Sequence, residues 1–223
     1  MPRNTRVDIG DKVYHVINRA NGRYKIFNTE KDYRIIETLL LETKELVDMR
    51  ILAYVIMPNH WHLVLYPKQD GDLGTFMHRL SNSHTRKVHA LTNTNGTGHL
   101  YQGRYKSFLV ETDSYLLSLI KYVERNPVRA KITDKCESWQ WGSAWRRING
   151  TKEERKLLDP SLTPFPGNYI KWVNTPDNPE DLEFIRASVT KGIPYGGEKW
   201  VNQMVTAYHL ESTLRFPGRP KKL

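Results

Sequence analysis

The stretch Met57–Leu65 constrains the fold more than any other part of this sequence. It links two short runs rich in β-branched, aromatic and other apolar residues, Arg50–Met57 and His60–Tyr66. Only Pro58 and Asn59 separate the two runs, and both residue types favour tight turns. Strands joined by so short a connection must be antiparallel neighbours in one sheet. We therefore expect a β-hairpin at this position.

The second strand of this hairpin carries two histidines one residue apart, His60 and His62, with Trp61 between them. Side chains alternate between the faces of a strand, so the histidines project together, and we expect Trp61 to be buried in the opposite layer. Imidazole is a common metal ligand. The pair is equally compatible with two satisfied polar residues on a half-solvated sheet face. A metal site needs a further ligand from elsewhere in the chain.

The region before Trp145 alternates between strand-like and helix-like patterns. Runs of β-branched and aromatic residues predict strands at 13–17, 50–57, 60–66 and 105–110. Apolar residues at helical spacing predict helices at 29–47, 72–91 and 111–124, the last ending near Asn126-Pro127. This order is that of an α+β, ferredoxin-like (RRM-like) βαββαβα sandwich with a four-stranded antiparallel sheet.

The character of the chain changes after Trp145. Six prolines between residues 160 and 194 interrupt it, so we expect an irregular segment over 148–178, followed by short helices at 180–190 and 198–209. The predicted organisation is a catalytic domain, 1–147, and a helical and irregular C-terminal extension, 148–223. The extension ends in a basic tail, Pro217-Gly218-Arg219-Pro220-Lys221-Lys222, which resembles a minor-groove-binding AT hook or a disordered solubilising tail.

The charge balance favours an anionic partner. The formal net charge is +10, which fits nucleic acid or an acidic membrane surface. No apolar run reaches membrane-spanning length, the first ten residues lack the apolar core of a signal peptide, and the single cysteine, Cys136, excludes an intramolecular disulfide. These features favour a cytoplasmic protein that does not enter a membrane.

The third predicted helix carries Tyr122 and Asn126, which share a helix face because they are four residues apart. A tyrosine hydroxyl can act as a nucleophile, and an amide oxygen can bind a metal ion. The pair can also be a packing residue and a helix cap beside Pro127. If this helix lies near the hairpin, His60, His62 and Asn126 make three ligands around one divalent ion, with Tyr122 beside a bound phosphate.

Four motifs together resemble a known family. The chain is similar to the HUH-type single-tyrosine transposases, and within them to the REP-associated tyrosine transposases, relatives of the insertion-sequence-200-like enzymes. The resemblance spans about Asp11 to Trp145. Its motifs are Tyr14-His15-Val16 near an Asn-Arg pair, Met57-Pro58-Asn59-His60-Trp61-His62, Gln102-Gly103-Arg104-Tyr105-Lys106-Ser107 and Tyr122-Val123-Glu124-Arg125-Asn126-Pro127-Val128-Arg129-Ala130.

The resemblance implies an activity and a set of roles. His60 and His62 would bind Mg²⁺ or Mn²⁺, and Asn126 would complete the metal site. Tyr122 would cut single-stranded DNA through a covalent 5′-phosphotyrosine and leave a free 3′-OH, so that rejoining needs no ATP. The implied substrate is the hairpin of a repetitive extragenic palindrome. A monomer is favoured over a homodimer, and whether the Tyr122 helix acts in cis is left open.

A segment of the chain without acidic residues also suggests that the protein binds a DNA strand. No acidic residue occurs between Asp72 and Glu111, and an exposed aromatic there could stack an unpaired base. A run of one sign can also be only a solvated face. The cations expected to contact DNA, in this span and beyond it, are Arg79, Arg86, Lys87, Arg104, Lys106, Arg129 and Arg219.

Two other functions remain possible at the level of sequence. The first is a non-catalytic nucleic-acid binder on an RRM-like sheet, with structural histidines and base-stacking aromatics. The second is a zinc hydrolase built on His60 and His62, which is weakened because the sequence has no His-Glu-x-x-His helix and no third strong ligand with a glutamate base.

Overall fold

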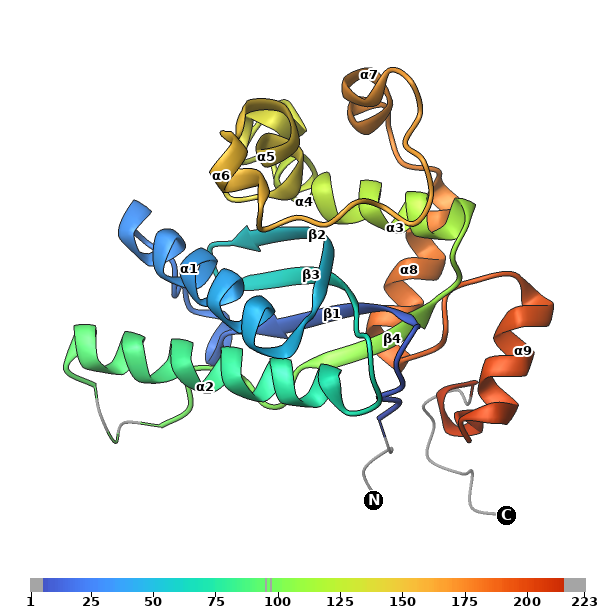
Figure 1. Ribbon diagram of the computed structural model, residues 1–223, viewed down its shortest axis with the longest axis horizontal. Helices are drawn as coiled ribbons and strands as arrows, with labels where there is room; N and C mark the ends of the chain where they lie inside the picture. Colours follow the sequence, from blue (N-terminus) through green and yellow to red (C-terminus); the bar gives the residue numbers. More distant parts are fainter. Residues whose placement is uncertain (1–5, 95, 97, 215–223) are drawn as a thin grey trace, which may run out of the picture.

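The computed structural model describes residues 6–94, 96 and 98–214, and a four-stranded antiparallel sheet lies at its centre. The strands are β1 (Val13–Arg19), β2 (Arg50–Met57), β3 (His60–Tyr66) and β4 (Lys106–Val110). Their spatial order is β2-β3-β1-β4, with every neighbouring pair antiparallel (Figure 1). This arrangement is the ferredoxin-like pattern. The predicted fold class and the hairpin of β2 and β3 are confirmed.

The sheet separates two helical layers. α1 (Glu30–Val47) and α2 (Asp72–Thr92) pack together on one face, and α3 (Ser114–Glu124) lies on the other (Figure 1). Successive side chains of β3 point to opposite faces of the sheet, so they pack into different cores. Trp61 and Leu63 join the core beneath α1 and α2, whereas Val64 belongs to the core beneath α3. Trp61 is 1% exposed, as predicted.

Local sequence signals explain where the long helices begin. Thr29 precedes α1 and forms a reciprocal capping box with Asp32, which satisfies two backbone N–H groups at the helix start. α3 begins later than predicted, because Asp113 caps it by accepting the Tyr115 N–H at 2.9 Å. Glu111, which we expected inside the helix, donates its backbone N–H to the Tyr195 carbonyl instead.

The chain after α3 is more helical than the sequence suggests. A short helix, α4, continues directly past the predicted stop at Pro127, because a proline at the start of a helix needs no N–H donor. α6 and α7 lie inside the segment predicted to be irregular, and their length of four to six residues is too short to give an apolar period. The predicted helices at 180–190 and 198–209 are confirmed as α8 and α9. The bounds are α4 (Asn126–Arg129), α5 (Ser143–Asn149), α6 (Lys152–Arg155), α7 (Tyr169–Asn174), α8 (Pro179–Lys191) and α9 (Glu198–Ala207), with 3₁₀ turns at Asn21–Arg23, Cys136–Ser138 and Glu211–Leu214.

Residues from the second half of the chain cover both edges of the sheet. Along β2, the Ile56 N–H donates to the Trp141 carbonyl at 2.8 Å. Along β4, the Tyr195 N–H donates to the Leu109 carbonyl at 2.8 Å, and Tyr195 itself is buried. Covered edges leave fewer unpaired backbone groups for pairing with another chain. In the part of the chain that the structure describes, no helix combines the length and the apolar composition needed to cross a membrane.

A buried carboxylate fixes α3 to the segments that follow it. The side chain of Glu124 is 0% exposed. It accepts hydrogen bonds from Ser143 Oγ at 2.6 Å, Tyr169 Oη at 2.6 Å and Arg147 Nε at 3.2 Å. A buried charge is tolerated only when it is paired and hydrogen-bonded. The position of α3 on the sheet therefore depends on residues in α5 and α7.

We expect Trp61→Ala to lower the free energy of unfolding by about 3–5 kcal/mol, because it empties a large buried site between the sheet and α2 and removes the N–H donor to Tyr101. Urea denaturation followed by circular dichroism measures the loss. Leu46→Ala is the matched control, since Leu46 is 70% exposed, and its effect should stay within about 0.5 kcal/mol. Equal losses in the two variants would contradict the burial argument.

Candidate functional site

The face of the sheet toward α3 carries the two predicted histidines. Their ring centroids are 5.1 Å apart, and His62 is buried while His60 is half-buried. The Nδ1 atom of His60 lies 2.7 Å from the Asn59 side-chain oxygen, which can only accept, so Nδ1 carries the proton. The lone pair of His60 is therefore on Nε2. The hairpin turn thus fixes the orientation and the protonated nitrogen of the His60 imidazole.

A third histidine, His15, lies beside this pair and was not among the predicted site residues. Its Nε2 atom is 2.8 Å from Nδ1 of His62, and their rings stack with centroids 5.0 Å apart. β1 places His15 here because the β1–β3 register sets Ile17 opposite His62, so that His15 is a diagonal neighbour on the same face. The signal was present in the Tyr14-His15-Val16 motif, but only the strand pairing relates it to His62.

All three imidazoles are held in the neutral form. Burial lowers the pKa of His15 to about 3. Burial, assisted by the charge of Arg19, lowers the pKa of His60 to about 4. Burial also lowers the pKa of His62 well below its ordinary value, and the neighbouring histidines and arginines act in the same direction. Neutral imidazole is the form that binds metal ions.

Tyr122 reaches this cluster from α3. Its side chain is 8% exposed, and its ring centroid lies 6.0 Å from that of His62 and 6.3 Å from that of His15. The structure therefore brings together the two elements that the sequence could only suppose to be near each other. The guanidinium carbon of Arg129 lies 4.1 Å from the centroid of the Tyr122 ring, a cation–π contact, and its NH2 group donates to the Tyr122 carbonyl at 2.6 Å.

Asn126 lies one helical turn after Tyr122. Its amide nitrogen donates to the carbonyls of Tyr122 and Val123, each at 3.2 Å. With the nitrogen used in this way, the oxygen is the free end of the amide, and no described residue forms a hydrogen bond with it. These contacts hold the Asn126 side chain against the last turn of α3, which carries Tyr122. Among the described residues there is no group of three or more His, Cys, Asp or Glu side chains placed to hold a metal ion.

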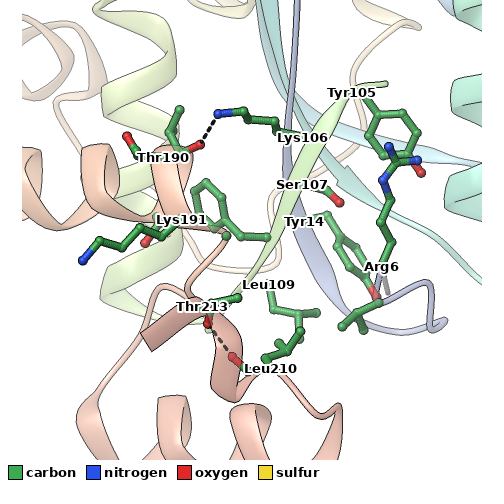
Figure 2. A pocket seen from close by; sticks show the side chains of 15 residues that line it. Arg6, Tyr14, Tyr105, Lys106, Ser107, Leu109, Thr190, Lys191, Leu210 and Thr213 are labelled. Carbon is green, nitrogen blue, oxygen red and sulfur yellow. Dashed lines mark hydrogen bonds between the residues drawn. The ribbon is translucent and has the colours of Figure 1, made fainter. Parts of the chain in front are cut away.

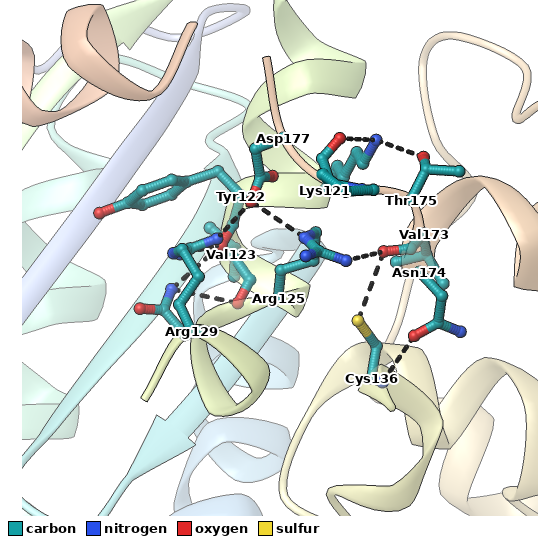
Figure 3. A network of polar contacts seen from close by, with 12 residues as sticks. Lys121, Tyr122, Val123, Arg125, Arg129, Cys136, Val173, Asn174, Thr175 and Asp177 are labelled. Carbon is teal, nitrogen blue, oxygen red and sulfur yellow. Dashed lines mark hydrogen bonds and ion pairs between the residues drawn. The ribbon is translucent and has the colours of Figure 1, made fainter. Parts of the chain in front are cut away.

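A carboxylate from the C-terminal extension holds the arginines of this helix. Asp177 accepts from Arg125 at 2.9 Å and from Arg129 at 3.2 Å, and its side chain is 8% exposed (Figure 3). In the same view the ring of Tyr122 points away from this ion-pair network. Arg129, predicted to contact DNA, has its guanidinium committed to Asp177 and Tyr122. Sequence reasoning missed Asp177, because an acidic residue between two prolines in an irregular segment gives no local signal.

The other predicted DNA-contacting cations occupy two separate regions. Arg79, Arg86 and Lys87 are exposed on α2, which covers the sheet face opposite the histidines, so the structure does not bring them to Tyr122. Arg104 is exposed before β4. Arg219 lies outside the described residues. Their contacts with DNA stay predictions.

Two cations do share the histidine face. Lys106 pairs with Ile17, which pairs with His62, and its Nζ lies 3.5 Å from the Val189 carbonyl beside a cavity between β4 and α8 (Figure 2). Arg19, not predicted as a site residue, is paired with His60 across the β1–β3 ladder. Residues paired across a ladder project to the same face. A phosphate near the histidines would therefore have positive charge close by.

The model of the family described as transposase IS200 like matches residues 10–126. The chain is similar to a solved structure of a REP-associated tyrosine transposase bound to a REP hairpin. The structural alignment covers 76% of this chain and 93% of the chain in that structure, with a TM-score of 0.56 and 18% sequence identity. The alignment with the crystal structure of a candidate transposase from Deinococcus radiodurans R1 covers 59% of this chain and 92% of the chain in that structure, with 17% sequence identity and a TM-score of 0.40. No curated protein sequence matches the chain.

The buried histidines make stability depend on pH. A histidine in the unfolded chain has a pKa near 6.5, and the pKa values of these histidines in the folded protein are lower. At pH values between the folded and the unfolded pKa, the unfolded state binds more protons than the folded state. The free energy of unfolding therefore falls as the pH drops below about 6.5. His84, outside the cluster, has its pKa lowered to about 4 by burial and accepts from the Tyr101 hydroxyl at 2.7 Å. We expect His84→Asn, which keeps an acceptor but does not titrate, to reduce the loss of stability between pH 7 and pH 5 by roughly 1–2 kcal/mol.

Urea denaturation of both proteins at the two pH values measures this difference. Other titrating groups affect both proteins equally, so only the difference between their pH dependences counts. Identical pH dependences would show that His84 does not bind a proton on unfolding.

Proposed function

The chain belongs to the IS200-like transposase family, and we propose that it cuts and rejoins single-stranded DNA with Tyr122 as the nucleophile. The single observation that carries the proposal is the position of the Tyr122 ring, 6.0 Å from His62 on the sheet face that also bears His60. Three imidazoles and the guanidinium of Arg129 lie around this ring. Each of these groups has a role if a phosphodiester lies over the cluster.

The proposed reaction exchanges one phosphodiester for another. The Tyr122 oxygen attacks the phosphorus and forms a 5′-phosphotyrosine, while the bond from phosphorus to the 3′ oxygen breaks. The phenolic proton passes to solvent water, and the departing 3′ oxygen takes a proton from water to give a free 3′-OH. A free phenol has a pKa near 10, so charge stabilisation at the phosphate matters. Arg129, fixed over the ring by Asp177, positions Tyr122 and adds positive charge. Rejoining is the same exchange in reverse.

The donor set near Tyr122 fits a divalent ion, for which we propose Mg²⁺ or Mn²⁺. His60 has its Nε2 lone pair free, because its Nδ1–H donates to the Asn59 side-chain oxygen. His62 and the Asn126 oxygen would supply the other ligands. Two nitrogens and one oxygen leave coordination positions open for water or substrate. When bound, such an ion neutralises charge on the phosphate oxygens.

We propose hairpin DNA with a single-stranded flank as the substrate and a repetitive extragenic palindrome as its source. The solved relative was bound to a REP hairpin. In this chain the net charge of +10 and the exposed cations on α2 and before β4 support an extended DNA contact, and Arg19 and Lys106 support a phosphate near the histidines. Residues 1–147 would form the catalytic unit. The extension would act in part through Asp177, and the protein would work as a cytoplasmic monomer.

We expect Tyr122→Phe to abolish the covalent protein–DNA adduct while leaving DNA affinity within about twofold, because it removes the attacking oxygen and little contact area. Hairpin oligonucleotides with a single-stranded 5′ flank are incubated with Mn²⁺ and resolved on a denaturing gel. A tyrosine-linked 5′ end retains a 3′ label. Fluorescence anisotropy gives the affinity.

Tyr115→Phe is the matched control, since Tyr115 lies on the same helix and packs against Tyr195, away from the cluster. It should form the adduct normally. His62→Ala should form none. An adduct with Tyr122→Phe would refute the nucleophile, whereas tight hairpin binding without cleavage by the wild type would favour a non-catalytic binder.

A further inference from the structure

The proposed function requires that, in the hydrogen bond between His15 and His62, His62 is the donor and His15 the acceptor. His15 is 0% exposed, and the two nitrogens, Nε2 of His15 and Nδ1 of His62, are 2.8 Å apart. Two neutral imidazoles can share this contact in only two ways, because one nitrogen must carry the hydrogen and the other must accept it. The choice decides which nitrogen of His62 keeps a lone pair.

In the first arrangement His15 donates, and the proton of His62 then sits on Nε2, where it blocks metal binding. In the second arrangement His62 donates from Nδ1, and the lone pair of its Nε2 is free. No described residue forms a hydrogen bond with Nε2 of His62, and that atom is not among the buried unpaired atoms, so it remains open to a ligand. Only the second arrangement lets His62 act as a ligand.

The rest of the His15 environment argues against a purely structural role. Its Nδ1 atom is buried without a hydrogen-bond partner among the described residues, and its ring packs against Phe108 at a centroid distance of 4.9 Å. An unpaired buried polar atom costs stability, so an apolar side chain would suit this site better. A residue kept at such a cost is expected to contribute elsewhere, and within the described part of the chain its one polar side-chain contact is with His62.

We propose that His15 is a positioning residue whose Nε2 accepts a hydrogen bond from Nδ1–H of His62 and thereby leaves the Nε2 lone pair of His62 free for the divalent ion. The inference rests on the proposed function, since it assumes that His62 is a ligand. It gives His15 the part that Asn59 has for His60, whose Nδ1 lies 2.7 Å from the Asn59 oxygen. Outer hydrogen bonds of this kind orient a ligating imidazole and raise its basicity.

Two substitutions separate this role from packing. His15→Gln places an amide oxygen where Nε2 of His15 lies, so this oxygen can still accept the hydrogen bond from Nδ1–H of His62. His15→Met fills similar space but has no comparable acceptor. Mn²⁺ binding to the full chain without DNA is measured by electron paramagnetic resonance of the free ion. We expect His15→Met to weaken Mn²⁺ binding about 10–100-fold and to melt at the wild-type temperature or above. His15→Gln should stay within about threefold of the wild type.

His84→Asn is the control, because His84 is also buried but lies on the other face of the sheet, and it should not change Mn²⁺ binding. Wild-type affinity in His15→Met, or equal weakening in His15→Gln, would overturn the role of His15 while leaving the metal site intact. If the wild type binds no Mn²⁺, or if His62→Ala binds Mn²⁺ as tightly as the wild type, the metal site of the proposed function is overturned. The role of His15 then falls with it.

A measurement on the unaltered protein covers the case in which a variant fails to fold. Long-range proton–nitrogen correlation spectra distinguish the two neutral tautomers of each histidine. We expect His62 to carry its proton on Nδ1 in the metal-free wild type. A proton on Nε2 of His62 would contradict the proposal.

Discussion

The antiparallel pairing of β1 with β3 is the interaction on which the candidate site depends. These are the two central strands, and their register sets Ile17 opposite His62 and Arg19 opposite His60. A slip of one residue would turn His15 into the core beneath α1 and α2 and separate it from His62. The register is held because each face is buried, by residues such as Tyr14 on one side and Val64 on the other. The arrangement of the polar cluster is thus set by apolar packing.

Buried charge fixes the second half of the site. Glu124 and Asp177 are nearly inaccessible carboxylates, and each is paired with cations or hydrogen-bond donors of the protein. Removing one partner from such a pair leaves an uncompensated buried charge, which is far more costly than losing an exposed ion pair. Asp177 lies outside the region matched by the family model, residues 10–126, yet it holds the arginine that covers Tyr122. The extension therefore supports the geometry of α3 and of the residues directly after it.

Cations that could contact DNA lie on both sides of the sheet. Arg79, Arg86 and Lys87 are exposed on α2, while Arg19 and Lys106 belong to the face with the histidines. A short single strand at Tyr122 would contact only the second group. The proposal of a hairpin with a flanking strand gives the first group a role, because a larger substrate can follow phosphate-binding side chains around the molecule.

Sequence alone determined the strands, the long helices and the fold class, because alternation and helical spacing are local properties that burial on one side enforces. It also singled out His60, His62, Tyr122 and Asn126 from their spacing and motifs. It did not find the role of His15, Arg19 or Asp177, nor the short helices α6 and α7. Only the tertiary structure decided that His15 touches His62, that Asp177 holds Arg129, and that the α2 cations face away from Tyr122. The physical reason is that these relations depend on strand register and on pairing between distant segments, which no local pattern of side chains encodes.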